Sequence, residues 1–117
     1  MATPHAQLKP AQIKLDDELV KKARMLEIAG DPTRIRILCL LFRHKQAFVS
    51  NIAESLDMTV ACISHHLQLM RDNGYLTSER MGNNVRYALA ESEFTAKLQQ
   101  LICGCQALER PGTKGRK

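Results

Sequence analysis

The first half of the chain carries apolar residues at helical spacing. In the first segment they stand at Leu19, Val20, Ala23 and Leu26, and Gly30 is placed to end the helix. A stripe of this kind predicts one amphipathic helix that ends before this glycine.

A second helix is predicted to begin at Asp31-Pro32, because Asp is a favoured N-cap and Pro a favoured first helical residue. The residues from Ile37 to Phe42 are apolar on nearly every side, so we expect this helix to be the central, buried one. A loop is expected at residues 44–47.

Two further helical patterns follow, separated by a tight turn. The second of them is expected to start at Thr59, a natural N-cap, and to end at Asn73-Gly74. Together they have the outline of a helix-turn-helix. The first of the two has apolar residues at i, i+3, i+4 and i+7, namely Val49, Ile52, Ala53 and Leu56.

The pattern then changes its period. After the turn residues at 81–84, apolar Val85, Tyr87 and Leu89 alternate with Arg86 and Ala88. Alternation of period two across a Gly/Asn turn predicts a β-hairpin.

The last pattern is again helical and starts at about Ser92. The expected fold class is therefore mainly α, with four helices, a small β-hairpin and a fifth helix. The apolar stripe of the fifth helix holds Phe94, Leu98, Leu101 and Ile102.

Length and charge narrow the interpretation. The chain has 117 residues, and 17 Lys and Arg against 12 Asp and Glu give a net charge of +5. We place one domain at residues 15–105, between a flexible arm at 1–14 and a basic flexible tail at 106–117. The positive balance favours a polyanionic partner, and the absence of a long apolar stretch predicts a cytosolic protein that does not enter a membrane.

Four cysteines stand at Cys39, Cys62, Cys103 and Cys105. In a reducing compartment they are free thiols, metal ligands or redox sensors more often than structural disulfides. The chain has no C-x-x-C motif and no Cys/His pair at a helix start, so a thiol enzyme is disfavoured and no enzymatic activity is expected.

The helix predicted after Thr59 separates into two sides on a helical wheel. Its apolar side holds Ile63, Leu67 and Met70 together with Val60, and Cys62 and His66 lie on the flank of that side. The opposite side is small and polar, and it presents Ala61, Ser64, His65 and Gln68.

The adjacent His65 and His66 point about 100° apart on this wheel and cannot chelate one metal ion between them. We expect His66 to be a packed histidine with one hydrogen-bonded nitrogen. Cys62 is expected to face the core flank, with little role in sensing.

A small, polar helix face suits the DNA major groove, because short side chains allow close approach and Ser, His and Gln supply donors and acceptors. The alternative is an ordinary solvated face. The hairpin carries Arg80 and Arg86 around Gly82-Asn83-Asn84, which suits a wing on the phosphate backbone or in a minor groove. The rival interpretation is a winged-helix module that binds another protein.

Several joined motifs carry a family resemblance: the D-P-T-R helix start, S-H-H-L, N-G-Y-L and G-N-N-V-R-Y-A-L. In this order they resemble the ArsR/SmtB family of bacterial winged helix-turn-helix repressors, over about residues 19–102. The resemblance implies a homodimer that binds a double-stranded DNA operator with an inverted repeat, represses transcription and leaves DNA when an inducer acts. The dimer would pair through the first and last helices, at Leu19, Val20, Ala23, Leu26, Phe94, Leu98 and Leu101.

The same resemblance implies which residues read DNA. Val60 departs from the family pattern, which often has a polar residue at this position. The reading helix would use Thr59, Val60, Ala61, Ser64, His65 and Gln68, and the wing would use Arg80, Asn83, Asn84 and Arg86.

Two inducer sites known in the family are not expected here. The place of the metalloid C-x-C set reads Phe48-Val49-Ser50, and the last helix offers no histidine for the zinc-type site. Cys39, Cys103 and Cys105 remain as candidates for an inducer site. Cys105 falls on the inward stripe, with Cys103 on the far side, if the helix continues past Gly104; otherwise Gly104 frees both.

Two kinds of inducer fit these cysteines. A cysteine in the second helix and one near the end of the last resembles the dithiol branch of the family, which responds to reactive sulfur or oxidants by linking two thiols. Three thiolates would instead suit As(III), Cd(II), Pb(II) or Hg(II), and no cofactor is otherwise required. A regulator with no inducer site remains an alternative, in which Cys39 is a small core residue.

Overall fold

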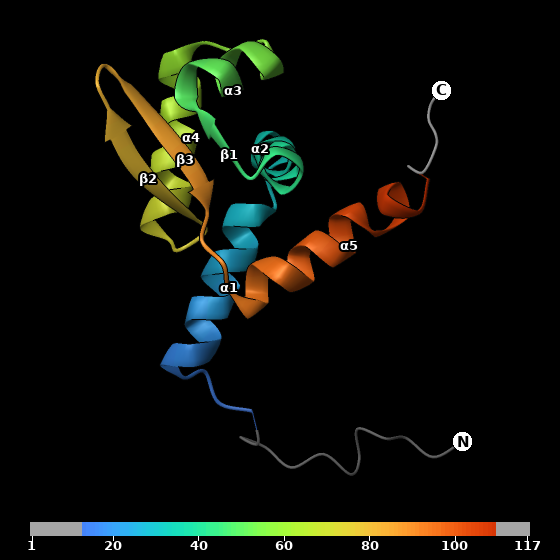
Figure 1. The fold of residues 1–117 in the computed structure, drawn as a ribbon. Helices are drawn as coiled ribbons and strands as arrows, with labels where there is room; N and C mark the ends of the chain where they lie inside the picture. The colour runs from blue at the N-terminus through green and yellow to red at the C-terminus, as the bar shows by residue number, and fades with distance from the viewer. Residues whose placement is uncertain (1–12, 110–117) are drawn as a thin grey trace.

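The computed structural model describes residues 13–109, with side chains described up to Cys103. Helices and a small sheet alternate as the sequence pattern predicts (Figure 1). The elements are α1 Asp17–Ala29, α2 Pro32–His44, β1 Gln46–Phe48, α3 Val49–Leu56, α4 Val60–Asp72, β2 Leu76–Met81, β3 Asn84–Leu89 and α5 Glu93–Glu109.

Side-chain caps fix where three of the helices begin. The Asp31 carboxylate accepts a hydrogen bond from the backbone N–H of Arg34 at 3.1 Å, and Pro32 follows it as the first helical residue. The Thr59 hydroxyl accepts in the same way from the N–H of Cys62 at 3.1 Å, and Asp16 caps α1. Each cap satisfies an N–H that has no partner inside its helix, and the caps at Asp31 and Thr59 confirm the predicted starts of α2 and α4.

The core is built around α2, as predicted. Ile37, Leu38 and Leu41 are fully buried and pack with the apolar faces of α3 and α4. All four apolar residues predicted for α3 are buried, and so are Ile63, Leu67 and Met70 of α4. The helix-turn-helix formed by α3 and α4 is therefore fixed to the rest of the chain by one continuous apolar cluster.

The sheet has one strand more than the predicted hairpin. The β2–β3 hairpin closes through Gly82 and Asn83, and Gly82 takes the positive φ of 65° that such a tight turn requires. The prediction of a loop at residues 44–47 needs correction. Gln46 and Ala47 belong to β1, which pairs antiparallel with β3 and places Ala47 opposite Tyr87. A three-residue strand is too short to show a period, and its partner lies forty residues further along the chain.

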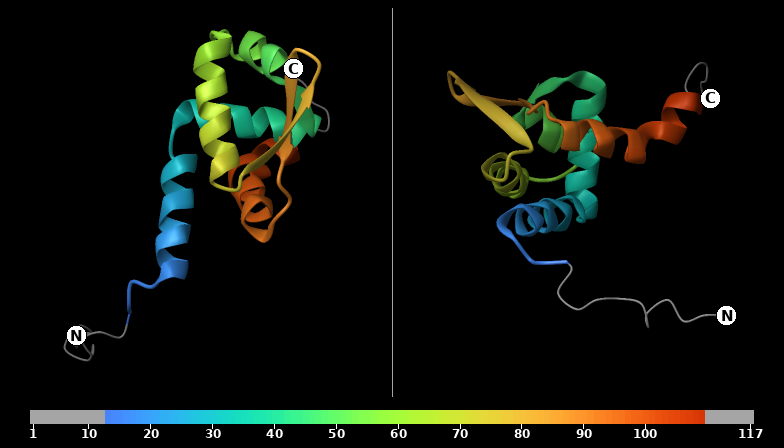
Figure 2. Two further views of the ribbon diagram at one scale, coloured as in Figure 1. Left: turned by 90° about the vertical axis from the view of Figure 1, so that its left-hand side faces the viewer. Right: turned by 90° about the horizontal axis from the view of Figure 1, so that it is seen from below.

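The hairpin projects beyond the helical core, and the C-terminal part of α5 extends away from that core (Figure 2). The helix α5 does not break at Gly104 but continues to Glu109, so the predicted domain end at residue 105 falls inside this helix. The predicted flexible arm and basic tail include residues 1–12 and 110–117, which lie outside the described residues.

The inward face of α5 differs from the predicted stripe. Thr95 and Leu98 are buried, and Ile102 and Cys103 pack against the core, whereas Leu101 is 80% exposed. Three of the four predicted residues, Phe94, Leu98 and Ile102, therefore do face the core, and the inward face extends to Thr95 and Cys103 in place of Leu101. Apolar residues occur on more than one side of this helix, so periodicity alone did not decide which side is buried.

Candidate DNA-binding surface and thiol pair

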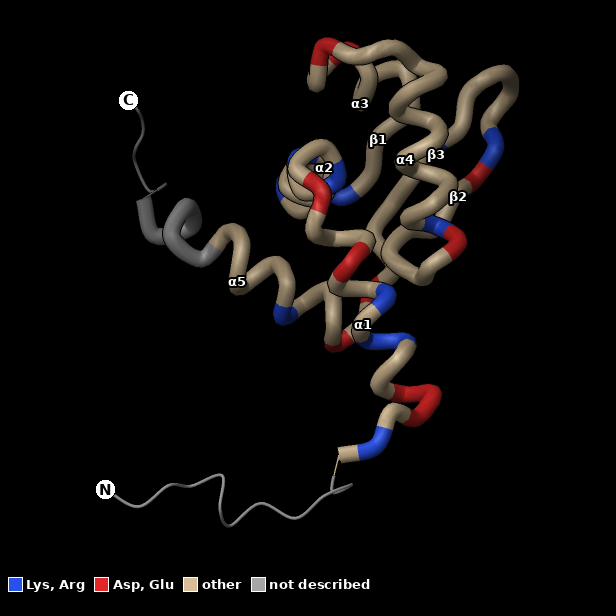
Figure 3. Tube along the Cα trace, turned by 180° about the vertical axis from the view of Figure 1, so that it is seen from behind, with Lys and Arg blue, Asp and Glu red and all other residues tan. Residues whose placement is uncertain are grey.

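The predicted reading face of α4 is open to solvent. Ala61, His65 and Gln68 are exposed and Ser64 is half-buried, while the opposite side of the helix is fully buried. The helix carries no charged residue before Arg71 and Asp72 at its end (Figure 3). This surface can therefore approach a polyanion closely, with polar atoms that both donate and accept hydrogen bonds.

Two residues at the start of α4 depart from the predicted wheel. Val60 was expected on the apolar side but is 49% exposed, and Cys62 was expected at the core flank but is exposed. Both lie in the first turn of α4, where Ala61 is exposed as well and the first buried residue is Ile63. Val60 consequently joins Thr59, which is also exposed, on the surface proposed to read DNA.

His66 is a half-buried histidine, as predicted. Its Nδ1 accepts a hydrogen bond from Nε of Arg34 at 3.2 Å. Burial, and then the positive charge of Arg34, lower the pKa of His66 below the ordinary 6.5. The His65 ring lies with its centroid 6.3 Å away and is exposed, so the two neighbouring histidines have separate environments.

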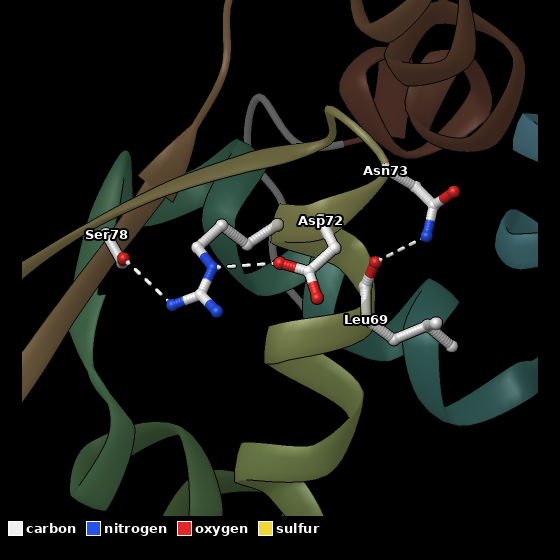
Figure 4. Close-up of polar contacts among 5 residues, drawn as sticks. Leu69, Asp72, Asn73 and Ser78 are labelled. Atoms are coloured by element: carbon white, nitrogen blue, oxygen red, sulfur yellow. Dashed lines mark hydrogen bonds and ion pairs between the residues drawn. The ribbon is translucent and has the colours of Figure 1, made fainter.

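The last turn of α4 is joined to the hairpin (Figure 4). The side-chain amide of Asn73 donates to the carbonyl of Leu69 at 2.8 Å and closes the helix. The Arg71 guanidinium lies 3.3 Å from a carboxylate oxygen of Asp72 and donates to the hydroxyl of Ser78 on β2 at 3.4 Å. These contacts connect the orientation of the hairpin to that of α4.

The four predicted wing residues have different environments. Arg80 and Asn83 are exposed at the tip, and the Arg80 guanidinium donates to the Gly82 carbonyl at 3.4 Å. By contrast, Arg86 forms an ion pair with Glu79 on the neighbouring strand, and the Asn84 amide donates to the hydroxyl of Ser50 on α3 at 3.0 Å.

Sequence reasoning missed Ser50 and Glu79 as partners of the wing. Nothing in the local pattern indicates them, because each contact joins segments that the fold brings together. Asn84 attaches the wing to the helix-turn-helix, and Arg80 is the wing cation with the most open surroundings.

The structure brings Cys39 of α2 next to Cys103 of α5. Both thiols are half-buried. Burial is the main cause that raises the pKa of Cys39, the neighbouring Cys103 raises it further, and the positive charge of Arg43 partly opposes both. The prediction that Cys103 lies on the far side of α5 is wrong, because the inward face of this helix is wider than the predicted stripe and includes Cys103. The side chain of Cys105 lies outside the described residues.

The predicted dimer residues fall into two groups. On α1, Leu19, Val20, Ala23 and Leu26 form an exposed apolar stripe. On α5, Leu101 is exposed, but Leu98 is buried in the core of its own chain.

Phe94 of α5 also packs within its own chain, edge-on against the ring of Tyr75 at a centroid distance of 5.8 Å. The Tyr75 hydroxyl donates to the Met25 carbonyl of α1 at 2.6 Å, and burial raises its pKa to about 12. The ring of Tyr75 therefore links the turn after α4 to both α1 and α5.

The described residues contain neither a cluster of metal ligands nor a membrane-spanning helix. Within residues 13–103, no three His, Cys, Asp or Glu side chains gather as a metal site would require. None of the helices in the described part of the chain has the length and apolar character that a membrane span needs.

A helix-turn-helix followed by a hairpin, with an open polar face on its second helix, defines a winged helix-turn-helix DNA-binding protein. A family model described as bacterial regulatory protein, arsR family, matches residues 31–78. The transcriptional regulator CmtR of Mycobacterium tuberculosis is 35% identical over 80 residues, which cover 68% of this chain and 67% of that protein. The chain therefore belongs to the ArsR family of bacterial regulatory proteins.

Other relatives are also transcriptional regulators. The arsenical resistance operon repressor of Escherichia coli is 33% identical over 67 residues, 57% of each chain. The crystal structure of the AntR antimony-specific transcriptional repressor superposes with a TM-score of 0.67 at 25% identity, covering 88% of this chain and 96% of that one. As a member of this family, the chain is a DNA-binding transcriptional regulator.

Proposed function

We propose that this chain binds an inverted-repeat operator as a homodimer, with α4 of each copy in the major groove, and that chemistry at Cys39 and Cys103 releases it. The open polar face of α4 carries the DNA part of the proposal. His65 and Gln68 contact base edges, while Thr59 and the wing residue Arg80 contact the backbone.

Dimer formation rests on the exposed apolar stripe of α1. Leu19, Val20 and Leu26 expose 41–59% of their surface, and Leu101 adds a further exposed leucine on α5. Burial of such residues against a second copy removes apolar surface from water. A symmetric pair also supplies two reading helices, which a short helix-turn-helix needs for affinity and which match the two halves of an inverted repeat.

The proposed release chemistry links α2 to α5. The side chains of Cys39 and Cys103 lie close enough to interact, which supports a disulfide between them as the product of oxidation. The two thiols lose two protons and two electrons, which hydrogen peroxide accepts to become two water molecules. A covalent bond from α2 to α5 changes how α5 sits in the dimer and thereby the spacing of the two α4 helices.

A second candidate inducer is a thiophilic ion such as As(III). Two relatives are named for arsenic and antimony, and paired thiolates are soft ligands that suit such ions. In this version Cys39 and Cys103 both bind the ion, and no electrons are transferred.

The DNA part is tested by selecting duplexes from a random-sequence library with the reduced protein. We expect selected duplexes with two related half-sites, and an affinity that falls steeply as salt rises because bound counterions are released. Failure to enrich any duplex, or binding that is insensitive to salt, would contradict this function and favour the protein-interaction alternative.

The release part is tested on the selected duplex with wild type, Cys39→Ser, Cys103→Ser and, as a matched exposed control, Cys62→Ser. Peroxide should release wild type and Cys62→Ser but neither of the other variants, and intact mass should fall by two hydrogens. Because the pKa of Cys39 is raised, the reaction should accelerate as pH increases toward and above 9.0. Release of Cys39→Ser at the wild-type rate would reduce Cys39 to a packing residue.

Arsenite in place of peroxide separates the two candidate inducers. Release with a mass gain of one arsenic per chain supports the ion. After the arsenic is removed, the mass of the chain should not show the loss of two hydrogens that a disulfide would cause. Release by peroxide alone supports dithiol oxidation.

A further inference from the structure

Two residues from the family motifs meet at a half-buried contact, away from the reading face. Nε of Arg34, in D-P-T-R, donates to Nδ1 of His66, in S-H-H-L, at 3.2 Å. A terminal nitrogen of the same guanidinium donates to the carbonyl of Ile28 at 3.1 Å. One side chain on α2 therefore connects the end of α1 with the middle of α4.

The Ile28 carbonyl needs this external donor. It belongs to the last turn of α1, where carbonyls have no helical partner, and the residue four positions later is Pro32, which has no N–H. The guanidinium of Arg34 satisfies this carbonyl. Loss of Arg34 would thus remove a helix cap and the link to His66 at the same time.

The contact to His66 requires one protonation state. An arginine is always a donor, so Nδ1 of His66 must hold a free lone pair, and the ring is neutral with its proton on Nε2. Protonation would remove the acceptor and place two positive charges side by side. The charged and titratable groups that face the ring are Arg34 and Asp31 from α2 and His65 from α4 itself.

We propose that His66 is a positioning residue for DNA binding: its neutral ring, held by Arg34, keeps α4 oriented so that His65 and Gln68 reach the bases, and its protonation weakens binding. The proposal depends on α4 being the reading helix. In this proposal His66 does not itself touch DNA, because its ring is turned toward Arg34 of α2.

The direction of the pH effect follows from linkage. If DNA prefers the neutral ring, affinity is full above the pKa of His66, which lies below 6.5, and falls as the ring becomes charged. DNA phosphates acting only through their charge would do the opposite and favour a protonated histidine. The sign of the effect therefore separates positioning from simple electrostatics.

The first experiment measures the dissociation constant of the selected duplex from pH 8 to pH 5 at fixed ionic strength, for wild type and His66→Asn. Asn keeps an acceptor oxygen near the position of Nδ1 but cannot be protonated. The two proteins should bind alike at pH 8, and wild type should become progressively weaker than His66→Asn as the pH falls from 6.5 toward 5. A ratio that stays constant with pH would overturn the proposal.

A matched pair of arginine variants tests the partner. Arg34→Lys keeps the charge, but a lysine cannot donate to both acceptors as the guanidinium does. The ratio of the dissociation constants at pH 5 and pH 8 should therefore be smaller than for wild type. Arg36→Lys is the control, because Arg36 also lies on α2 but donates to the Leu56 carbonyl of α3 at 3.2 Å. Equal pH profiles for Arg34→Lys and wild type would contradict the role of Arg34.

A titration of wild type by NMR needs no variant to fold. The His66 ring is followed with pH in free protein and in the DNA complex, and DNA should lower its pKa. An unchanged or raised pKa in the complex would overturn the inference while leaving the repressor function intact. Failure of wild type to bind any duplex would instead count against the DNA function itself.

Discussion

The helices α4 and α5 are both amphipathic, but the apolar pattern located the buried face of α4 more completely than that of α5. The predicted apolar residues Ile63, Leu67 and Met70 of α4 are all fully buried. In α5 the predicted stripe included Leu101, which is 80% exposed, and omitted Cys103, which packs against the core.

The difference follows from the number of surfaces that each helix serves. The body of α4 packs within its own chain on one side and is polar on the other, so its periodicity has a single solution. The helix α5 packs on α2 but also carries apolar residues such as Leu101 on an uncovered side. An apolar stripe locates a buried face only where no second apolar surface competes with it.

The largest expected difference between the helices comes from the same substitution in each. Leu67→Ala should lower the free energy of unfolding by about 2 to 5 kcal/mol, because it leaves a cavity in the core. Leu101→Ala should change the stability of the chain by less than about 0.5 kcal/mol but weaken the dimer. Urea denaturation and sedimentation equilibrium measure the two effects, and equal losses of chain stability would show that α5 is buried in another way.

A smaller effect is expected on DNA binding. Gln68→Ala and His65→Ala on α4 should each weaken binding of the selected duplex by about 1 to 3 kcal/mol, because each removes a polar contact to DNA. Fluorescence anisotropy measures this change, with circular dichroism to confirm the fold. Gln100→Ala, an exposed glutamine on α5, is the matched control, and a comparable loss in that variant would argue against α4 as the specific reader.

The smallest effect concerns the N-caps of these two helices, Thr59 for α4 and Ser92 for α5. Thr59→Ala and Ser92→Ala each remove a hydroxyl that accepts a hydrogen bond from the first turn of its helix, from Cys62 N–H and Thr95 N–H respectively. Each variant should lose about 1 kcal/mol of stability in thermal or urea unfolding. Only Thr59→Ala should also weaken DNA binding, so a similar loss in Ser92→Ala would place α5 closer to DNA than proposed.

Residues close together in the sequence determined where most helices begin and end and where the hairpin forms. The D-P start of α2, the Thr59 cap and the Asn73-Gly74 end of α4 depend on residues within one helical turn, and period and capping therefore predicted them. The hairpin and the open face of α4 follow from equally short spacings.

Tertiary structure alone decided which distant residues meet. The pairing of β1 with β3, the approach of Cys103 to Cys39 and the hydrogen bond from Arg34 to His66 all join segments far apart in the chain. Such contacts depend on how helices pack and turn about their axes, and a shift of one residue rotates a helical side chain by about 100°. The repeat of apolar residues along the chain does not contain that information when a helix has more than one apolar side.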